Sequence, residues 1–125
     1  MAFLGGYFKK LSLPPEELRA QNLRHWVKSL PGVTPIEKLA ARQRARAAGV
    51  VQNLRIDPRE GTGSIEATII DGSGQVITKW LGRSSLQGIR LGMGLIVEGV
   101  AGIGTDGDLQ FLNPEYELVP GPEHG

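Results

Sequence analysis

Two runs of alternating apolar and polar side chains, joined by a short turn, constrain the fold of this chain more than any other feature. Ile65, Ala67 and Ile69 point to one side of an extended segment, and "QVITKWLG" at 75–82 has the composition of a returning strand. The turn "DGSG" at 71–74 contains residues that tolerate positive φ. The pattern therefore predicts a β-hairpin.

Glycine extends this prediction to the rest of the chain. Of 18 glycines, three precede residue 47 and fifteen follow it, and glycine suits turns and bulges but is unfavourable in helices. Gly49 is expected at a bulge or bend, and Pro114 is expected to turn or end the last strand. The predicted strands cover 44–56, 64–70, 75–82, 95–103 and 109–118. With a connector at 83–94, they predict a mainly β fold, a five-stranded OB-fold Greek-key barrel with an N-terminal helical arm. An SH3-like barrel is the alternative.

The first 46 residues differ from the rest in charge and in period. They contain nine Lys or Arg against three acids, which gives +6, whereas residues 47–125 contain five against ten, which gives −5. Leu23, Val27 and Leu30 recur at helical spacing, and a second helical turn is expected with Thr34 as its N-cap. We therefore predict a basic helical arm at 1–43, a barrel at 44–119 and a flexible tail at 120–125.

The composition excludes several classes of site. The absence of cysteine excludes disulfides, thiolate nucleophiles and cysteine-ligated metals. His25 and His124 are isolated, and no catalytic constellation stands out. The "GIGTDG" motif at 102–107 is followed by too few residues for a dinucleotide-binding unit. Lys9 and Lys10 follow the first apolar residues, the reverse of the order in a secretory signal, and the most apolar segment contains Glu98, so we expect neither a secretory signal nor a membrane span. We expect a cytoplasmic, non-enzymatic protein without cofactor, metal or membrane contact.

Trp80 has two possible roles, in the core or as a platform for a nucleic-acid base. Pairing across the turn places it beside the apolar face of the first strand, which favours the core. A bulge near Lys79 would reverse this assignment. If Trp80 is inside, the outer face of the hairpin presents Thr68, Ile70, Ile77 and Lys79 beside Glu66. That face lacks an aromatic side chain for stacking, and the loop at 104–108 contributes Asp106 and Asp108, which repel phosphates.

Three arginines suggest a surface for phosphates. Arg42, Arg44 and Arg46 alternate, so in a strand all three project from one face, about 7 Å apart along it. A guanidinium offers a planar fork of donors that matches phosphate. Arg83 and Arg90 in the connector could extend this row. If the chain is still helical at Arg42, only Arg42 and Arg46 align and the row dissolves. The alternative interpretation of the arginines is a solvated edge that prevents pairing with other chains.

The runs "RARAAGVVQNLRI", "DGSGQVITKWLG", "LQGIRLGMGLIVEGVA" and "NPEYEL" together resemble a known family. The segment from about Pro35 to Leu118 is similar to small actinobacterial OB-fold nucleic-acid-binding proteins and, more distantly, to the wedge OB domain of RecG-type helicases. The resemblance implies a nucleic-acid ligand, with DNA, single-stranded or branched, favoured over RNA. The candidate binding residues are Arg42, Arg44, Arg46, Lys79, Trp80, Arg83 and Arg90, acting mainly through phosphate contacts.

A protein-interaction or homo-oligomerisation module is the alternative function. In that case the helix face of Leu23, Val27 and Leu30 would dock a partner or a second copy, together with the N-terminal aromatic residues Phe3, Tyr7 and Phe8. The acidic second part of the chain and the missing outer aromatic side chain favour this alternative.

Overall fold

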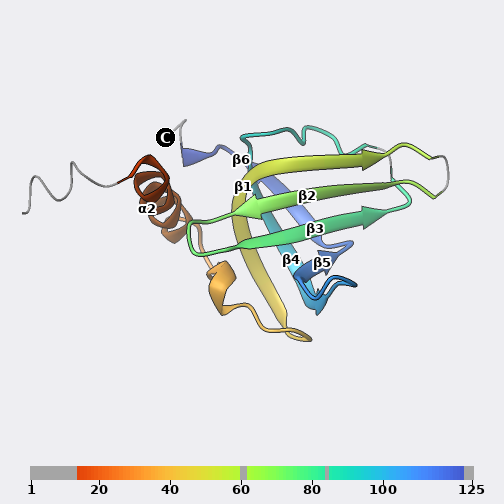
Figure 1. The fold of residues 1–125 in the computed structure, drawn as a ribbon, viewed down its shortest axis with the longest axis horizontal. Coiled ribbons are helices and arrows are strands. Elements are labelled where there is room, and N and C mark those ends of the chain that lie inside the picture. Colours follow the sequence, from red (N-terminus) through yellow and green to blue (C-terminus); the bar gives the residue numbers. More distant parts are fainter. Residues whose placement is uncertain (1–13, 60–61, 84, 123–125) are drawn as a thin grey trace, which may run out of the picture.

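A computed structural model describes residues 14–59, 62–83 and 85–122 and shows a mainly β protein with one α-helix (Figure 1). This confirms the predicted class. The N-terminal residues around Phe3, Tyr7 and Phe8 lie outside the described residues, as does His124. The elements are α2 (Pro15–Lys28), the 3-10 helix η1 (Ile36–Lys38), β1 (Arg44–Asp57), β2 (Ser64–Ile70), β3 (Gln75–Leu81), β4 (Gly94–Ile103), β5 (Leu109–Leu112) and β6 (Glu115–Val119).

The strands form one sheet that closes on itself. Their order is β1-β2-β3-β5-β4-β6, and an additional pairing of β1 with β4 joins five strands into a ring. Strand β5 pairs with β3 and β4, and β6 pairs with β4 alone. The sequence predicted one final strand at 109–118, but the structure has two strands there, β5 and β6. Asn113, at φ 50, and Pro114 divide the predicted strand into two strands, and both pair with β4.

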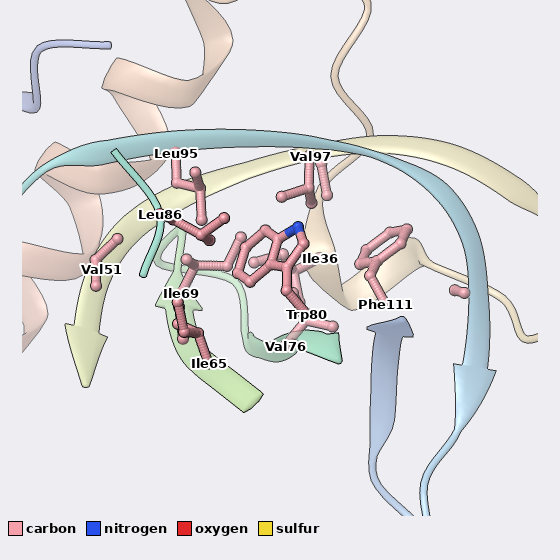
Figure 2. Close-up of a cluster of buried hydrophobic side chains, with 13 residues drawn as sticks. Ile36, Val51, Ile65, Ile69, Val76, Trp80, Leu86, Leu95, Val97 and Phe111 are labelled. Atoms are coloured by element: carbon pink, nitrogen blue, oxygen red, sulfur yellow. The ribbon is translucent and has the colours of Figure 1, made fainter. Parts of the chain in front are cut away.

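The inside of the ring is the hydrophobic core, and Trp80 belongs to it. Ile65 pairs with Trp80 and Ile69 with Val76, which is the register predicted from the alternation. The Trp80 side chain is 2 % exposed, and Figure 2 shows its ring among the other buried apolar side chains. Its Nε1–H donates a hydrogen bond to the Pro114 carbonyl at 3.0 Å. The core assignment is confirmed, and the stacking role is wrong because the ring is covered.

Strand β1 is shared between two neighbours and bends where it changes from one to the other. Its first half pairs with β4 and its second half with β2, and the change falls at Gly49 and Val50. A Cβ at Gly49 would lie 2.7 Å from the Ile70 carbonyl oxygen, so only glycine permits this approach. The register shift lies between Val51 and Asn53, a little beyond the glycine at which it was expected.

The β2–β3 turn is fixed by a buried carboxylate. Asp71 is 1 % exposed, and its Oδ1 accepts hydrogen bonds from the backbone N–H groups of Ser73 and Gly74 at 2.8 and 3.1 Å. Its Oδ2 accepts the N–H of Ile36 at 2.8 Å. The predicted hairpin is confirmed, and Asp71 also connects it to the start of η1.

Helix α2 packs on the outside of the ring. Leu23 and Val27 are buried, the Trp26 Nε1–H donates to the Pro120 carbonyl at 3.2 Å, and Arg24 Nη1 donates to the Gly72 carbonyl at 2.6 Å. The apolar positions offered to a partner by the alternative function are thus largely buried within the chain itself.

The segment after α2 lies against β1 near Arg46. Thr34 is not the predicted cap: its N–H donates to the Arg46 carbonyl at 2.8 Å, and Pro35 directly precedes η1 without a side-chain cap. The sequence correctly predicted a helical turn here, but the N-cap is Pro35 and not Thr34. This segment covers the outer side of β1 near Arg46.

Candidate nucleic-acid interface

The three arginines at the start of β1 do not form the single row predicted from the sequence. Strand β1 begins at Arg44, and Arg42 precedes it with φ 70, in the left-handed region. The Arg42 N–H donates to the Ala101 carbonyl at 2.7 Å, which fixes this turn against β4. Arg44 and Arg46 do share one face, because they are two residues apart in a strand. The prediction is confirmed for these two residues and wrong for Arg42.

Arg44 and Arg46 both contact one carboxylate. Arg44 Nη2 lies 3.1 Å from Glu98 Oε2, and Arg46 Nη1 lies 3.5 Å from Glu98 Oε1. Glu98 is the direct cross-strand partner of Arg46. The side chain of Arg44 is 59 % exposed, whereas those of Arg46 and Glu98 are 33 % and 35 % exposed. Exposed pairs of this kind contribute about 0–1 kcal/mol, so Glu98 reduces the positive charge here without locking either arginine.

A second carboxylate extends this acidic position. On its other side, Glu98 pairs with Glu115 of the edge strand β6, so Arg46, Glu98 and Glu115 follow one another across three strands. Like charges opposite each other are unfavourable. The arginine pair therefore offsets an acidic edge, and its net attraction for phosphate is smaller than the sequence suggested.

Lys79 lies on the outer face of the hairpin, as predicted. Its cross-strand partner is Glu66, which pairs on its other side with Arg55 of β1. Thr68 and Ile77 form the next pair on this face. Among the described residues, no aromatic side chain lies on the outer faces of β2 and β3, as expected once Trp80 is buried.

The connector between β3 and β4 separates its two arginines. Arg83 follows Gly82, whose N–H donates to the Gly63 carbonyl at 2.8 Å, and is exposed near the start of β2. Arg90 is exposed near the other end of the connector, where Gly92 donates to the Val51 carbonyl at the bend of β1. Arg83 is thus next to the end of β3 that holds Lys79, whereas Arg90 is not.

Ion pairs within the part of the chain that the structure describes are confined to Glu98 with its two arginines and to Arg59 with Asp57. The Asp57–Arg59 pair is short, at 2.7 Å, and hydrogen bonds from Arg59 hold the pKa of Asp57 below its ordinary value of 3.8. Lys79 and Arg83 have no carboxylate within ion-pair distance among the same residues. Their charges are available to a ligand.

The sequence interpretation missed a set of exposed aliphatic side chains. Val100 is 55 % exposed, and Leu81 and Leu112 are each 49 % exposed. Leu112 pairs with Lys79, and Val100 pairs with Arg44. Because Ala101 pairs with Phe111, one further step in the same antiparallel register brings Val100 and Leu112 next to each other. We call Leu81, Leu112 and Val100 the aliphatic row.

A signal for this row was present in the sequence. Glu98 marks the solvent side of "LIVEGVAGI", and Val100, two residues further, shares that side because side chains alternate in a strand. Gln110 marks Leu112 in the same way. Val100 and Leu112 each lie among other apolar residues, so the sequence pattern alone did not single them out as exposed.

A hollow of about 570 Å³ lies beside Leu81 at the β3 end of the row. Arg83, Asn113, Glu115 and Tyr116 are among the residues that line it, and Asn113 Oδ1 accepts the Leu81 N–H at 2.9 Å. Tyr116 contacts Trp80 edge to face, with ring centroids 5.5 Å apart. The hollow thus lies between the end of β3 and the start of β6.

Other kinds of site are not found in the described ranges 14–59, 62–83 and 85–122. They contain no group of three or more His, Cys, Asp or Glu side chains that could hold a metal ion. No helix described there has the length and apolar character to cross a membrane.

Comparison with known proteins gives a relation by fold. No family model matches the chain, and no curated protein matches it by sequence. Among solved structures, the chain is similar to RecG bound to a three-way DNA junction, with a TM-score of 0.58 and 17 % identity. The similarity covers 70 % of this chain and 12 % of the other, so it concerns one domain of a much larger protein. It shows a RecG-like domain fold.

Proposed function

We propose that this chain is a non-enzymatic, OB-fold DNA-binding module that acts in the cytoplasm on single-stranded or branched DNA. Five strands in the ring order β1-β2-β3-β5-β4 are what a small OB barrel requires. The observation that supports DNA most directly is the fold similarity to a protein bound to a DNA junction. Fold alone does not define a ligand, so the proposal also needs a surface.

The proposed surface uses phosphate contacts from two groups of cations. Lys79 and Arg83 supply the group at the end of β3, and Arg42 and Arg44 supply the group at the start of β1. Arg46 is less exposed than Arg44, and its Nε–H donates to the Pro31 carbonyl at 3.3 Å. We assign Arg46 and Arg90 smaller contributions and Trp80 none.

Fluorescence anisotropy with labelled single-stranded, duplex and forked DNA tests this proposal. With about four phosphate contacts, the slope of log K against log salt on a single strand should be near −3, from roughly −0.7 for each contact. Lys79→Ala and Arg44→Ala should each weaken binding and each reduce the slope. Lys28→Ala, an exposed lysine in the last turn of α2, is the matched control and should change neither.

Matched RNA oligonucleotides separate DNA from RNA in the same assay. Binding without salt dependence would falsify the phosphate mechanism, and no binding to any of these oligonucleotides at low salt would overturn the function.

A further inference from the structure

We infer that the aliphatic row is where the bases of a single nucleic-acid strand pack, between the two groups of cations. This inference rests on the proposed function and adds to it the path of the strand, across β3, β5, β4 and β1. It also assigns a role to residues that the phosphate contacts leave unexplained.

The order of side chains across the sheet supports this path. Lys79 of β3, Leu112 of β5, Val100 of β4 and Arg44 of β1 follow one another on the outer side. Neighbouring strands are about 4.8 Å apart, so the two cations are separated by roughly 14 Å. The two cations can contact two phosphates of a nucleic-acid strand, and the apolar side chains between them can contact the faces of its bases.

Charge favours this part of the surface over its neighbours. Asp106 and Asp108 precede β5, whereas Leu112 is the last residue of β5, so the row begins at the far end of that strand from the acidic loop. On the hairpin face, Glu66 lies between Lys79 and Arg55. An anion that binds through Lys79 therefore meets less repulsion toward Leu112 than toward β2.

Exposure and shape point to an apolar ligand group. Leu112 and Val100 are about half exposed, although the outer positions on either side are polar or charged. The hollow beside Leu81, whose lining includes Arg83 and Asn113 as well as the acidic Glu115, continues the row beyond Lys79. A flat base that lies on Leu112 can direct its neighbour toward this hollow.

Removing the apolar surface without changing charge tests the inference. The variant with Leu112→Ser and Val100→Ser keeps every cation, and both positions are exposed enough that folding should persist, as circular dichroism can check. Its affinity is measured for a single-stranded DNA and for an abasic strand of equal length, which has the same phosphates and no bases. Leu91→Ser is the matched control, because Leu91 is 61 % exposed in the connector.

The double variant should bind the base-containing strand at least about fivefold more weakly, a smaller loss than that of an aromatic platform. Its affinity for the abasic strand and its salt slope should stay at the wild-type values, and the control should behave as wild type.

Two results overturn the inference while the proposed function stands. In both, the wild type binds with the expected salt slope. In the first, the double variant binds the base-containing strand as tightly as the wild type. In the second, it loses affinity equally for both strands.

Failure of the proposed function looks different, because the wild type would then bind neither strand at low salt. If, in addition, an acidic amphipathic peptide binds the wild type and not the double variant, the row belongs to a protein partner.

Discussion

Strand β4 has two kinds of outer surface along a short distance. Ile96 and Val100 both point away from the ring, yet Ile96 is 4 % exposed and Val100 is 55 % exposed. Ile96 pairs with Ala48, which is fully buried on the same outer side and is likewise outside the central core cluster. Helix α2 packs on β1 with Leu23 and Val27 buried, and its Trp26 lies against Gly94 at the start of β4, on this part of the sheet. The same alternation therefore produces a second, smaller core where the chain folds back and a bare apolar surface where it does not.

The sharpest way to break this comparison is to shorten both side chains. Ile96→Ala should lower the free energy of unfolding by about 2–4 kcal/mol, because it leaves a cavity under covered surface. Val100→Ala should change it by no more than about 0.5 kcal/mol, because the side chain is already half in water. Urea denaturation of the two variants measures both. Equal losses would mean that Val100 is also covered.

The docking of helix α2 can be tested at a single glycine. Gly72 has φ +87, and a Cβ there would collide with the carbonyl oxygen of Ala20 in α2. Gly107 has the same φ and nothing within 4 Å of an added Cβ, so Gly107→Ala measures the backbone strain alone. We expect that strain to be about 1 kcal/mol. Gly72→Ala should lower stability by about 1–3 kcal/mol more, because the helix must shift. Equal effects in thermal or urea unfolding would contradict the packing described here.

Glu98 lies between the covered Ile96 and the exposed Val100 on β4. Removing its charge should strengthen DNA binding on the Val100 side. Glu98→Gln keeps the shape of the side chain and releases Arg44 and Arg46 from their shared carboxylate. Stability should change by less than about 1 kcal/mol, as for other exposed ion pairs. Affinity for single-stranded DNA should rise about threefold, with a steeper salt slope. Weaker binding by this variant in the anisotropy assay would show that Glu98 positions the arginines.

The smallest effect is expected at the far end of β1, beyond the part of this strand that pairs with β4. Hydrogen bonds from Arg59 lower the pKa of Asp57 below 3.8. The pair therefore contributes to stability above about pH 3.8, and the contribution is lost as the pH falls through the lowered pKa. Arg59→Gln should raise the pKa of Asp57 toward 3.8, which a carboxyl NMR titration measures. An unchanged pKa would mean that the pair does not persist in solution.

The sequence was sufficient for features that depend on neighbours in the chain. The alternation in β2 and β3 and the short turn placed Trp80 opposite Ile65, because register in a hairpin is set by the turn and by one buried face. The helix and the connector were also recognised, since their signals are local.

Features that depend on distant parts of the chain were missed. Glu98 reaches Arg44 across 54 positions, and no local pattern joins them. Arg42 has a positive φ that no property of arginine predicts, and it removes one member from the expected row. Pro114 was expected to turn or end the last strand, which predicts the break beside Asn113. The separate strand after the break was not predicted, because it depends on pairing with β4.

The position of β1 in the ring has a consequence for how the chain folds. Strands β1, β2 and β3 follow one another and can assemble from nearby residues, whereas the pairing of Arg44–Val50 with Gly94–Val100 must bring together segments about half the chain apart. Such long-range closure is slow, and folding of domains with this kind of topology takes on the order of milliseconds to seconds. The three-stranded meander should therefore form ahead of ring closure. Until β4 arrives, the first half of β1 would remain an unprotected edge, which makes that half the segment most at risk of joining another molecule during synthesis.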